Sequence, residues 1–322
     1  MKKTIDVYIA SCAPDGGVLH CRLDSDFSLH PAGFTAADRP MYLAREGNVL
    51  WGLLRAPDGY GGNSAFCRFA VRGDGALSGP EIIGSTGGEV ACHLYVDSGA
   101  AYCVNYISGS VMKFPDRLVR HDGKGPDPVR QASAHPHFIG GIPRSPFLCA
   151  ADLGTDTLYV YDRQLHLRSM ARVPAGRGAR HIAFSPDGAV LYCVNELGST
   201  ISVFAHRDGR LRYLRDYPTL PDGVHVSSTA AAIRISGDGR QLYASNRGHD
   251  SIAWYSVEGA RLDLREIVPC GGACPRDFNV IGDVLLCANE QSDSVAVFRL
   301  SGGRPVFTGK ALQIASPLCI AF

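Results

Sequence analysis

The stretch HIAFSPDGAVLYCVNELGSTISVFAHRDGRL, residues 181–211, contains short elements in a fixed order. An apolar run leads into a Ser-Pro-Asp-Gly turn, and a second apolar run ends at Asn195. A Gly/Ser loop follows, and then a third run, ISVFAH, with a polar fourth run after it. Runs of this length separated by turn residues are typical of antiparallel β-hairpins, and no helical period of 3.6 residues lies between them.

The same order of elements recurs along the chain. Copies of the unit occupy residues 233–262, 278–303 and 93–115, and a more divergent copy occupies 137–162. The second runs end at residues spaced 47, 43, 51 and 43 positions apart, namely Asn105, Asp152, Asn195, Asn246 and Asn289. Because the 322 residues divided by seven give 46, about seven units fill the chain. A period in the forties with four strands per unit indicates a β-propeller. We predict one all-β domain over residues 1–322, a seven-bladed β-propeller of four-stranded antiparallel blades.

Two further units are weaker. One extends from about Pro40 to Leu77, and the last combines PLCIAF at residues 317–322 with DVYIAS at 6–11 and GVLHCRL at 17–23. Pairing the two ends of the chain in one blade would close the ring and remove exposed strand edges. We therefore expect N- and C-terminal strands to share a sheet.

The charge balance limits the kinds of partner. The chain has 32 Lys and Arg against 31 Asp and Glu, a net charge of +1, whereas nucleic-acid binding requires a basic surface. The N-terminal stretch MKKTIDVYIA is too short and too mixed for a signal peptide, and no run of about 20 apolar residues occurs. We expect a cytoplasmic protein that binds neither nucleic acid nor membrane, as a monomer or weak homo-oligomer. A local cluster of arginines stays compatible with this balance.

The eleven cysteines do not indicate disulfides or metal. Cys103, Cys193 and Cys287 occupy one equivalent strand position, in CVN, CVN and CAN, as buried small side chains do. Cys270 and Cys274 form a single C-x3-C pair with no second pair nearby. We expect no metal and no cofactor.

The repeat also predicts which residues meet. The first two strands of a blade are joined by the Pro-Asp-Gly turn, so the start of the first and the end of the second lie at the opposite rim, with the strands roughly 4.8 Å apart. The first strand of a propeller blade is innermost. The polar residues at these positions are His93, His137, Arg180, His181, Arg276, Asp277, Asn105, Tyr106, Asp152, Asn195, Glu196, Asn246, Arg247 and Glu290. Polar groups that converge at the mouth of a channel are the default candidates for a functional site.

Three of these segments resemble a known family. ARHIAFSPDGAVLYCVNELGSTISVF, ASNRGHDSIAWYSV and the segment from CPRDF to CANEQSDSVAVF are similar to the lactonase family of seven-bladed propellers. That family includes the propeller-type 6-phosphogluconolactonases and, more distantly, the fungal carboxymuconate lactonizing enzymes. The resemblance covers nearly the whole chain from the third blade onward, and the first 90 residues match loosely. This chain departs from the family pattern at Ala230–Ala232, where a glutamate is usual, at Asp277, and at IPRSP in place of a Pro-Asp-Gly turn.

The resemblance implies hydrolysis of a small anionic sugar lactone, with 6-phosphogluconolactone of the pentose phosphate pathway as the expected substrate. It implies four catalytic residues: His137 of the His135-Pro136-His137 motif, Arg180, Glu196 and Arg247. Glu196 or His137 would serve as the base, and the arginines would hold the oxyanion or a substrate phosphate. The expected substrate-binding residues are His135, His93, His181, Arg276, Asn105 and Tyr106.

The residues leave alternatives open. Arg180 and Glu196 would also fit an ion pair that orders the rim, and the recurring asparagines, Asn105 among them, would fit turn caps. His181 would fit a core histidine, and only one of His135 and His137 can face the channel. Two other functions use the same residues or fold: a lactonizing enzyme acting on a dicarboxylic substrate, and a propeller that binds a ligand without catalysis.

Overall fold

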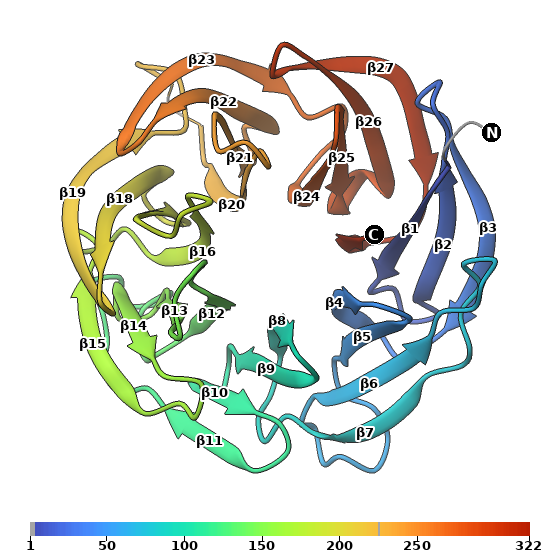
Figure 1. Cartoon of the computed structure of the whole chain (residues 1–322), viewed down its shortest axis with the longest axis horizontal. Coiled ribbons are helices and arrows are strands. Elements are labelled where there is room, and N and C mark those ends of the chain that lie inside the picture. The colour runs from blue at the N-terminus through green and yellow to red at the C-terminus, as the bar shows by residue number, and fades with distance from the viewer. Residues whose placement is uncertain (1–3, 225) are drawn as a thin grey trace.

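The structure, a computed structural model, describes residues 4–224 and 226–322, and its strands form seven four-stranded sheets around a central axis (Figure 1). Neighbouring strands within each sheet are antiparallel. Within these residues the only helical element is a single 3-10 turn at Glu290–Ser292. The predicted all-β, seven-bladed propeller is therefore confirmed.

Each blade places its first strand beside the axis and its last strand at the outer edge (Figure 1). The first four blades in chain order are β28 (Pro317–Ala321), β1 (Ile5–Ser11), β2 (Gly17–Leu23), β3 (Leu29–Ala36); β4 (Pro40–Glu46), β5 (Val49–Leu54), β6 (Ala65–Ala70), β7 (Glu81–Ser85); β8 (Ala91–Asp97), β9 (Ala100–Asn105), β10 (Ser110–Lys113), β11 (Arg117–Arg120); and β12 (Pro136–Gly141), β13 (Leu148–Asp152), β14 (Thr157–Tyr161), β15 (Leu167–Arg172). The remaining three are β16 (Ala179–Phe184), β17 (Val190–Asn195), β18 (Thr200–Arg207), β19 (Arg210–Pro218); β20 (Thr229–Ile235), β21 (Gln241–Arg247), β22 (Ser251–Glu258), β23 (Arg261–Pro269); and β24 (Pro275–Ile281), β25 (Val284–Asn289), β26 (Ser294–Ser301), β27 (Arg304–Gln313).

The ring closes through the two ends of the chain, as expected. Strand β28 pairs with β1, with Ile320 opposite Ile9 and Cys319 opposite Ala10. The side chain of Ile320 is buried in a cluster with Val7 and Val297, so it joins the closing blade to the blade before it. Such apolar contact between neighbouring blades holds the ring together.

Two of the recurring asparagines, Asn105 and Asn246, tie their blades to the one before. The Asn105 amide donates to the Ser110 hydroxyl and to the Thr86 carbonyl, each at 3.0 Å. Asn246 does the same with the Ser251 hydroxyl and the Thr219 carbonyl. Thr86 and Thr219 directly follow the outer strands of the preceding blades. These asparagines therefore stabilise the loop between the second and third strands, as the turn-cap interpretation predicts.

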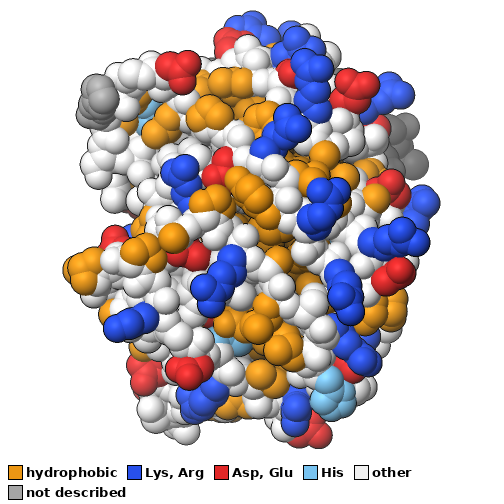
Figure 2. Space-filling view, turned by 90° about the vertical axis from the view of Figure 1, so that its left-hand side faces the viewer, with side chains coloured by type: hydrophobic (Ala, Val, Ile, Leu, Met, Phe, Trp, Pro, Cys, Tyr) orange, Lys and Arg blue, Asp and Glu red, His pale blue; other side chains and the backbone are white. Residues whose placement is uncertain are grey.

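The outer strands mix apolar and charged side chains. Figure 2 shows Lys and Arg side chains spread among apolar ones on the side of the molecule where β15 and β19 lie. Strand β19, with the sequence RLRYLRDYP, alternates charged and apolar residues, and Tyr213 is exposed on it. Charges of this kind on an edge strand oppose pairing with the edge of another molecule.

The inner strands share one irregularity. In every blade the pairing register between the first and second strands shifts near the rim. The inner strand thus carries a β-bulge, which adds an unpaired residue and redirects its side chain. Six of the seven inner strands begin with Pro or Ala, and proline is tolerated at the first residue of a strand and at bulges. The extra residues form what we call the bulge ring: Leu318, Met41, Cys92, His137, Arg180, Ala231 and Arg276.

The closing blade gives a first test. We expect Ile320→Ala to lower the free energy of unfolding by about 2–5 kcal/mol, because it leaves a cavity where an almost fully buried side chain joins two blades. Denaturant unfolding measures the change. Phe34→Ala on β3 of the same sheet is the control, since Phe34 is 54% exposed, and its cost should stay within about 0.5 kcal/mol. Equal effects of the two changes would contradict the role of β28 in closure.

Candidate active site

The bulge ring forms the floor of a cavity of about 430 Å³ at one mouth of the channel. Five of its members line this cavity: Met41, Cys92, His137, Arg276 and Leu318. The walls come from loops and from the ends of second strands, and their residues are Cys12, Arg55, Val90, Tyr106, Ile107, Arg130, Glu196, Arg247, Glu290 and Ser316. Residues from all seven blades therefore converge on one space.

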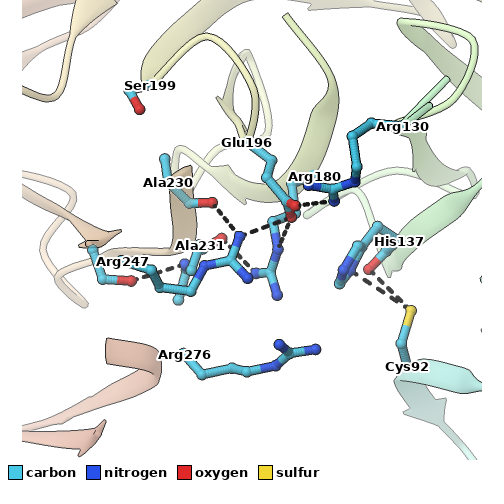
Figure 3. Close-up of polar contacts among 12 residues, drawn as sticks. Cys92, Arg130, His137, Arg180, Glu196, Ser199, Ala230, Ala231, Arg247 and Arg276 are labelled. Carbon is cyan, nitrogen blue, oxygen red and sulfur yellow. Dashed lines mark hydrogen bonds and ion pairs between the residues drawn. The ribbon is translucent and has the colours of Figure 1, made fainter. Parts of the chain in front are cut away.

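Glu196 is the centre of the charge arrangement (Figure 3). Its Oε2 accepts from Nε of Arg180 at 2.8 Å and lies 3.0 Å from Nη2 of Arg247. Its Oε1 accepts from Nη2 of Arg130. The Glu196 and Arg180 side chains are each only 3% exposed. One buried carboxylate therefore holds three guanidinium groups in place.

The protonation states in this cluster follow from the charges. Burial would raise the Glu196 pKa, but Arg247, Arg180, His137 and Arg130 outweigh it and hold that pKa well below its usual range. Burial, with the charge of Arg247, lowers the pKa of Arg180 to about 10. At neutral pH Glu196 is thus ionised and Arg180 is protonated, so Glu196 is a weak proton acceptor.

His137 lies on the floor beside this cluster and faces Cys92 (Figure 3). Its Nδ1 is 3.6 Å from the Cys92 sulfur, and its ring meets the Tyr106 ring edge-on at a centroid distance of 5.4 Å. Burial, and then the charge of Arg180, lowers the His137 pKa well below the usual histidine value. The imidazole is therefore neutral at physiological pH and can accept a proton.

Arg276 lies across the pocket from Glu196 and its arginines (Figure 3). Its Nη1 donates to Glu290 Oε2 at 3.3 Å, with both side chains between a quarter and a third exposed. Although burial acts to lower it, the Arg276 pKa is raised through Glu290. Burial raises the pKa of the Cys12 thiol, and the charges of Arg55 and Arg276 both oppose this rise, so these two arginines lie near the same thiol. The pocket thus has two groups of cations, one held by Glu196 and one formed by Arg276 and Arg55, neither of which forms an ion pair with Glu196 in the described part of the chain.

The structure brings most of the predicted residues together. His137, Glu196, Arg247, Arg276 and Tyr106 line the main cavity. Arg180 lies beneath them with its Nη1 donating to the Ala231 carbonyl at 2.6 Å, and His181 lines a smaller cavity below the floor.

Three other predicted residues do not reach this pocket. Asn105 is fully buried and uses its amide in the turn described above. The His135 ring bonds to the Tyr106 carbonyl through Nδ1 at 2.8 Å and stacks on the Tyr106 ring, so it supports the wall rather than lining it. His93 lies between Tyr42 and Phe138 and faces a different cavity, of about 450 Å³, at the opposite mouth. The two histidines of the His-Pro-His motif are thereby separated, with His137 alone on the floor.

Sequence reasoning did not single out Arg130 or Arg55. Arg130 comes from the loop between β11 and β12, which belongs to no repeat position. The one available signal is length, because the 47-residue spacing between Asn105 and Asp152 exceeds the 43 residues found twice elsewhere. Arg55 directly follows β5 in a blade whose sequence repeat is weak.

The described ranges, 4–224 and 226–322, contain no group of three or more His, Cys, Asp or Glu side chains arranged to hold a metal ion. Cys270 and Cys274 are buried as free thiols, and burial raises the pKa of Cys270 to about 12. In these same ranges no helix has the length and apolar character needed to cross a membrane.

Seven blades around a channel with an arginine-rich cavity at one mouth define a β-propeller with a polar axial pocket. The chain belongs to the lactonase family of seven-bladed β-propellers, whose model "Lactonase, 7-bladed beta-propeller" matches residues 6–322. The expected family membership is therefore confirmed.

Relatives and solved structures agree with this assignment. An uncharacterised protein from Lactococcus lactis subsp. cremoris is 38% identical over 264 residues, 76% of each chain, and one from Staphylococcus epidermidis is 34% identical over 84% of this chain and 82% of its own. The periplasmic gluconolactonase PpgL of Pseudomonas aeruginosa superposes with a TM-score of 0.87 at 25% identity, over 99% of this chain and 98% of its own. A candidate 6-phosphogluconolactonase from Bacteroides uniformis, 24% identical over 98% of both chains, shares the fold with a TM-score of 0.90.

The Glu196 cluster gives a second prediction. We expect Glu196→Gln to lower the free energy of unfolding by about 3–5 kcal/mol at pH 7, because it leaves buried arginines without their counter-charge. Glu290→Gln is the control. It removes one partly exposed pair, so it should cost less than about 1 kcal/mol. Denaturant unfolding measures both variants, and a milder effect of Glu196→Gln than of Glu290→Gln would contradict the central role of Glu196.

The buried histidines give a third prediction. Burial is the largest cause that holds the pKa values of His93, His137 and His181 well below 6.5. In the unfolded chain the same residues take up protons below about pH 6.5, so their stabilisation is complete above that pH and is lost as the pH falls. The free energy of unfolding should drop by about 1.4 kcal/mol per histidine between pH 7.5 and 5.5. Denaturant melts at both pH values measure this, and His181→Phe should remove one histidine's share. If His181→Phe loses as much unfolding free energy between pH 7.5 and 5.5 as the wild type does, the prediction is wrong.

Proposed function

We propose that the protein hydrolyses the ring ester of a small anionic sugar lactone, with 6-phosphogluconolactone as the expected substrate and 6-phosphogluconate as the product. The observation that carries this proposal is the neutral His137 on the cavity floor, with Glu196 and Arg247 in the wall beside it and Arg180 beneath. Ester hydrolysis needs a proton acceptor next to fixed positive charge, and this floor offers both. Membership of the lactonase family supports the reaction class.

The size and charge of the pocket support an anionic substrate of sugar size. A volume of about 430 Å³ is within the range of pockets for small metabolites, roughly 300–1,000 Å³. Four arginines and two glutamates line the cavity, and Arg180 adds a further positive charge beneath it. Excess positive charge in a partly enclosed site favours a ligand with more than one negative charge.

His137 is the proposed base. As a neutral imidazole it takes a proton from the attacking water and returns it to the ring oxygen when the ester bond breaks. Glu196 is unsuited to this step because both of its carboxylate oxygens are engaged by arginines. Its proposed role is to orient the guanidinium groups of Arg180 and Arg247.

Arg247 and Arg180 are the proposed oxyanion stabilisers. The Nε of Arg247 has no hydrogen-bond partner among the described residues, so it is a donor that a substrate oxygen could satisfy. Both guanidinium groups are already fixed by Glu196 and by the carbonyls of Ala230 and Ala231. Donors that need no rearrangement stabilise the charge that develops on the carbonyl oxygen in the transition state.

The second group of cations would bind the substrate's phosphate. Arg276 lies across the cavity from Glu196 (Figure 3), and Arg55 lines the same cavity, so an ester positioned at His137 could extend its phosphate toward them. A guanidinium fork suits such an oxyanion. A cytoplasmic location and a monomeric or weakly oligomeric state stay predictions of the sequence.

Three other functions use the same residues or the same fold. A sugar lactone without phosphate would match PpgL, which is a gluconolactonase, and would need only the buried arginines. A lactonizing enzyme acting on a dicarboxylate would run the ester reaction in the opposite direction, as the equilibrium of its substrate dictates. A propeller that binds without catalysis would retain affinity and show no turnover.

An assay with freshly prepared 6-phosphogluconolactone tests the proposal. We expect the protein to open the lactone well above the spontaneous rate, and Arg247→Ala to lower kcat/KM by about 10²–10³-fold, because it removes an oxyanion donor. Acid release at constant pH measures the rate. Arg265→Ala, an exposed residue on β23, is the control that should leave the rate unchanged.

The same assay with unphosphorylated gluconolactone separates the substrate classes. Arg276→Ala should raise KM for the phosphorylated lactone by about tenfold or more, from the loss of one charge-assisted contact, and should leave KM for gluconolactone unchanged. Turnover no faster than the spontaneous rate with either lactone would refute the proposed function.

A further inference from the structure

A small chamber lies directly beneath the bulge ring. Its volume is about 20 Å³, and it shares Met41, Cys92, His137, Arg276 and Leu318 with the floor of the main pocket. Four further residues line the chamber but not the main pocket: Tyr42, Arg180, His181 and Asp277. The chamber therefore lies next to His137, the proposed base, on the side of the floor that faces the central channel.

Two buried side chains in this chamber have polar atoms without protein partners. Asp277 is 1% exposed, and its Oδ1 accepts from Nη2 of Arg234 at 2.6 Å. Its Oδ2 has no hydrogen-bond partner among residues 4–224 and 226–322. His181 is 3% exposed, and within the same ranges neither of its ring nitrogens has a partner. Leaving such groups unsatisfied costs about 1–3 kcal/mol each, so a ligand that bonds to both stabilises the fold.

The size and chemistry of the chamber identify this ligand as water. A cavity of about 10–15 Å³ is enough for one water molecule, which needs two to four polar partners. The free carboxylate oxygen of Asp277 needs a donor, which excludes an anion. Burial, and then Arg180, holds the His181 pKa low, so its ring presents one donor and one acceptor nitrogen. Among the described residues, the His, Cys and Asp side chains here form no group of three or more arranged to hold a metal ion.

We propose that Asp277 and His181 bind one water molecule in this chamber and that this water is the nucleophile that opens the lactone ring. A substrate seated on the bulge ring excludes solvent from above, whereas the chamber supplies water from below, next to His137. This inference rests on the proposed lactone hydrolysis and assigns positioning roles to Asp277 and His181.

The step balances without any further reactant. The water oxygen bonds to the lactone carbonyl carbon as its proton passes to the neutral His137 ring, and the carbonyl electron pair moves onto oxygen beside the arginines. The bond between the acyl carbon and the ring oxygen then breaks, and the ring oxygen takes the proton from His137. One water molecule is added, and the product is the open hydroxy acid.

His181→Phe is the informative variant. Phenylalanine occupies the place of the imidazole and extends into the chamber, and no protein hydrogen bond is lost because His181 makes none among the described residues. We expect kcat for the lactone to fall at least tenfold with KM within about threefold, and the unfolding temperature to equal or exceed that of the wild type at pH 7.5. A role in packing alone would leave kcat unchanged.

Asp277→Asn is a second variant that changes the water ligand by a different route. It keeps the shape of the side chain but places a donor or a weaker acceptor where the carboxylate oxygen stood, and kcat should again fall. Because Arg234 then loses its buried partner, an unstable Asp277→Asn protein leaves His181→Phe to decide. His30→Phe on β3 is the control, since it makes the same chemical change at an exposed residue away from the channel.

High-resolution crystal structures of the wild type and His181→Phe give a readout that does not depend on activity. Density for an ordered water between Asp277 and His181 in the wild type, absent from the variant and accompanied by the loss of kcat, supports the inference. An empty chamber in the wild type, or a His181→Phe enzyme with wild-type kcat, overturns it. A wild-type protein that opens no lactone contradicts the proposed function instead, whether or not the water is present.

Discussion

The β-bulge at the start of each inner strand inserts one residue that has no partner on the neighbouring strand. In a regular strand, adjacent side chains point to opposite faces, so only alternate residues would reach the channel. The bulge brings two consecutive residues to the axis, as Arg180 with His181 and Arg276 with Asp277 show by lining the same chamber. Since all seven blades bulge at the same level, the floor continues around the whole axis. The position of the polar groups on this floor depends on that irregularity.

The bulge ring is chemically divided. Leu318, Met41 and Cys92 come from three consecutive blades and are apolar, whereas His137, Arg180 and Arg276 belong to the blades on the other side. A sugar lactone has the same kind of asymmetry, with an ester group at one place and carbon-hydrogen surface elsewhere. For the proposed substrate, the apolar half of the floor would lie against the sugar ring without unpaired polar groups beneath it. The polar half would then set the position of the ester carbonyl.

The Glu196 carboxylate offsets the cost of burying positively charged arginines at this floor. Burial, and then the positive charge of Arg247, lower the pKa of Arg180. The shared Glu196 carboxylate compensates for both through contacts of 2.8 and 3.0 Å. Arg130 approaches from a loop and completes the cluster. A carboxylate engaged in this way fits the orienting role proposed for Glu196, with the neutral imidazole of His137 as the proposed base.

Local patterns in the sequence were enough to predict the propeller, the number of blades, the closure by the terminal strands and the rim on which His137, Glu196 and Arg247 meet. Turn residues and apolar runs define each hairpin, and the repeat then defines the equivalent positions. Contacts between distant segments were needed to show that Arg130 joins the cluster, that His135 supports Tyr106 from outside, and that His93 faces the opposite mouth. The same holds for the turn that Asn105 stabilises and for the chamber that Asp277 and His181 share. The conformation of a bulge or a loop depends on pairing and packing between segments that are far apart in the chain. The repeat of hydrophobic residues along the sequence does not specify these contacts.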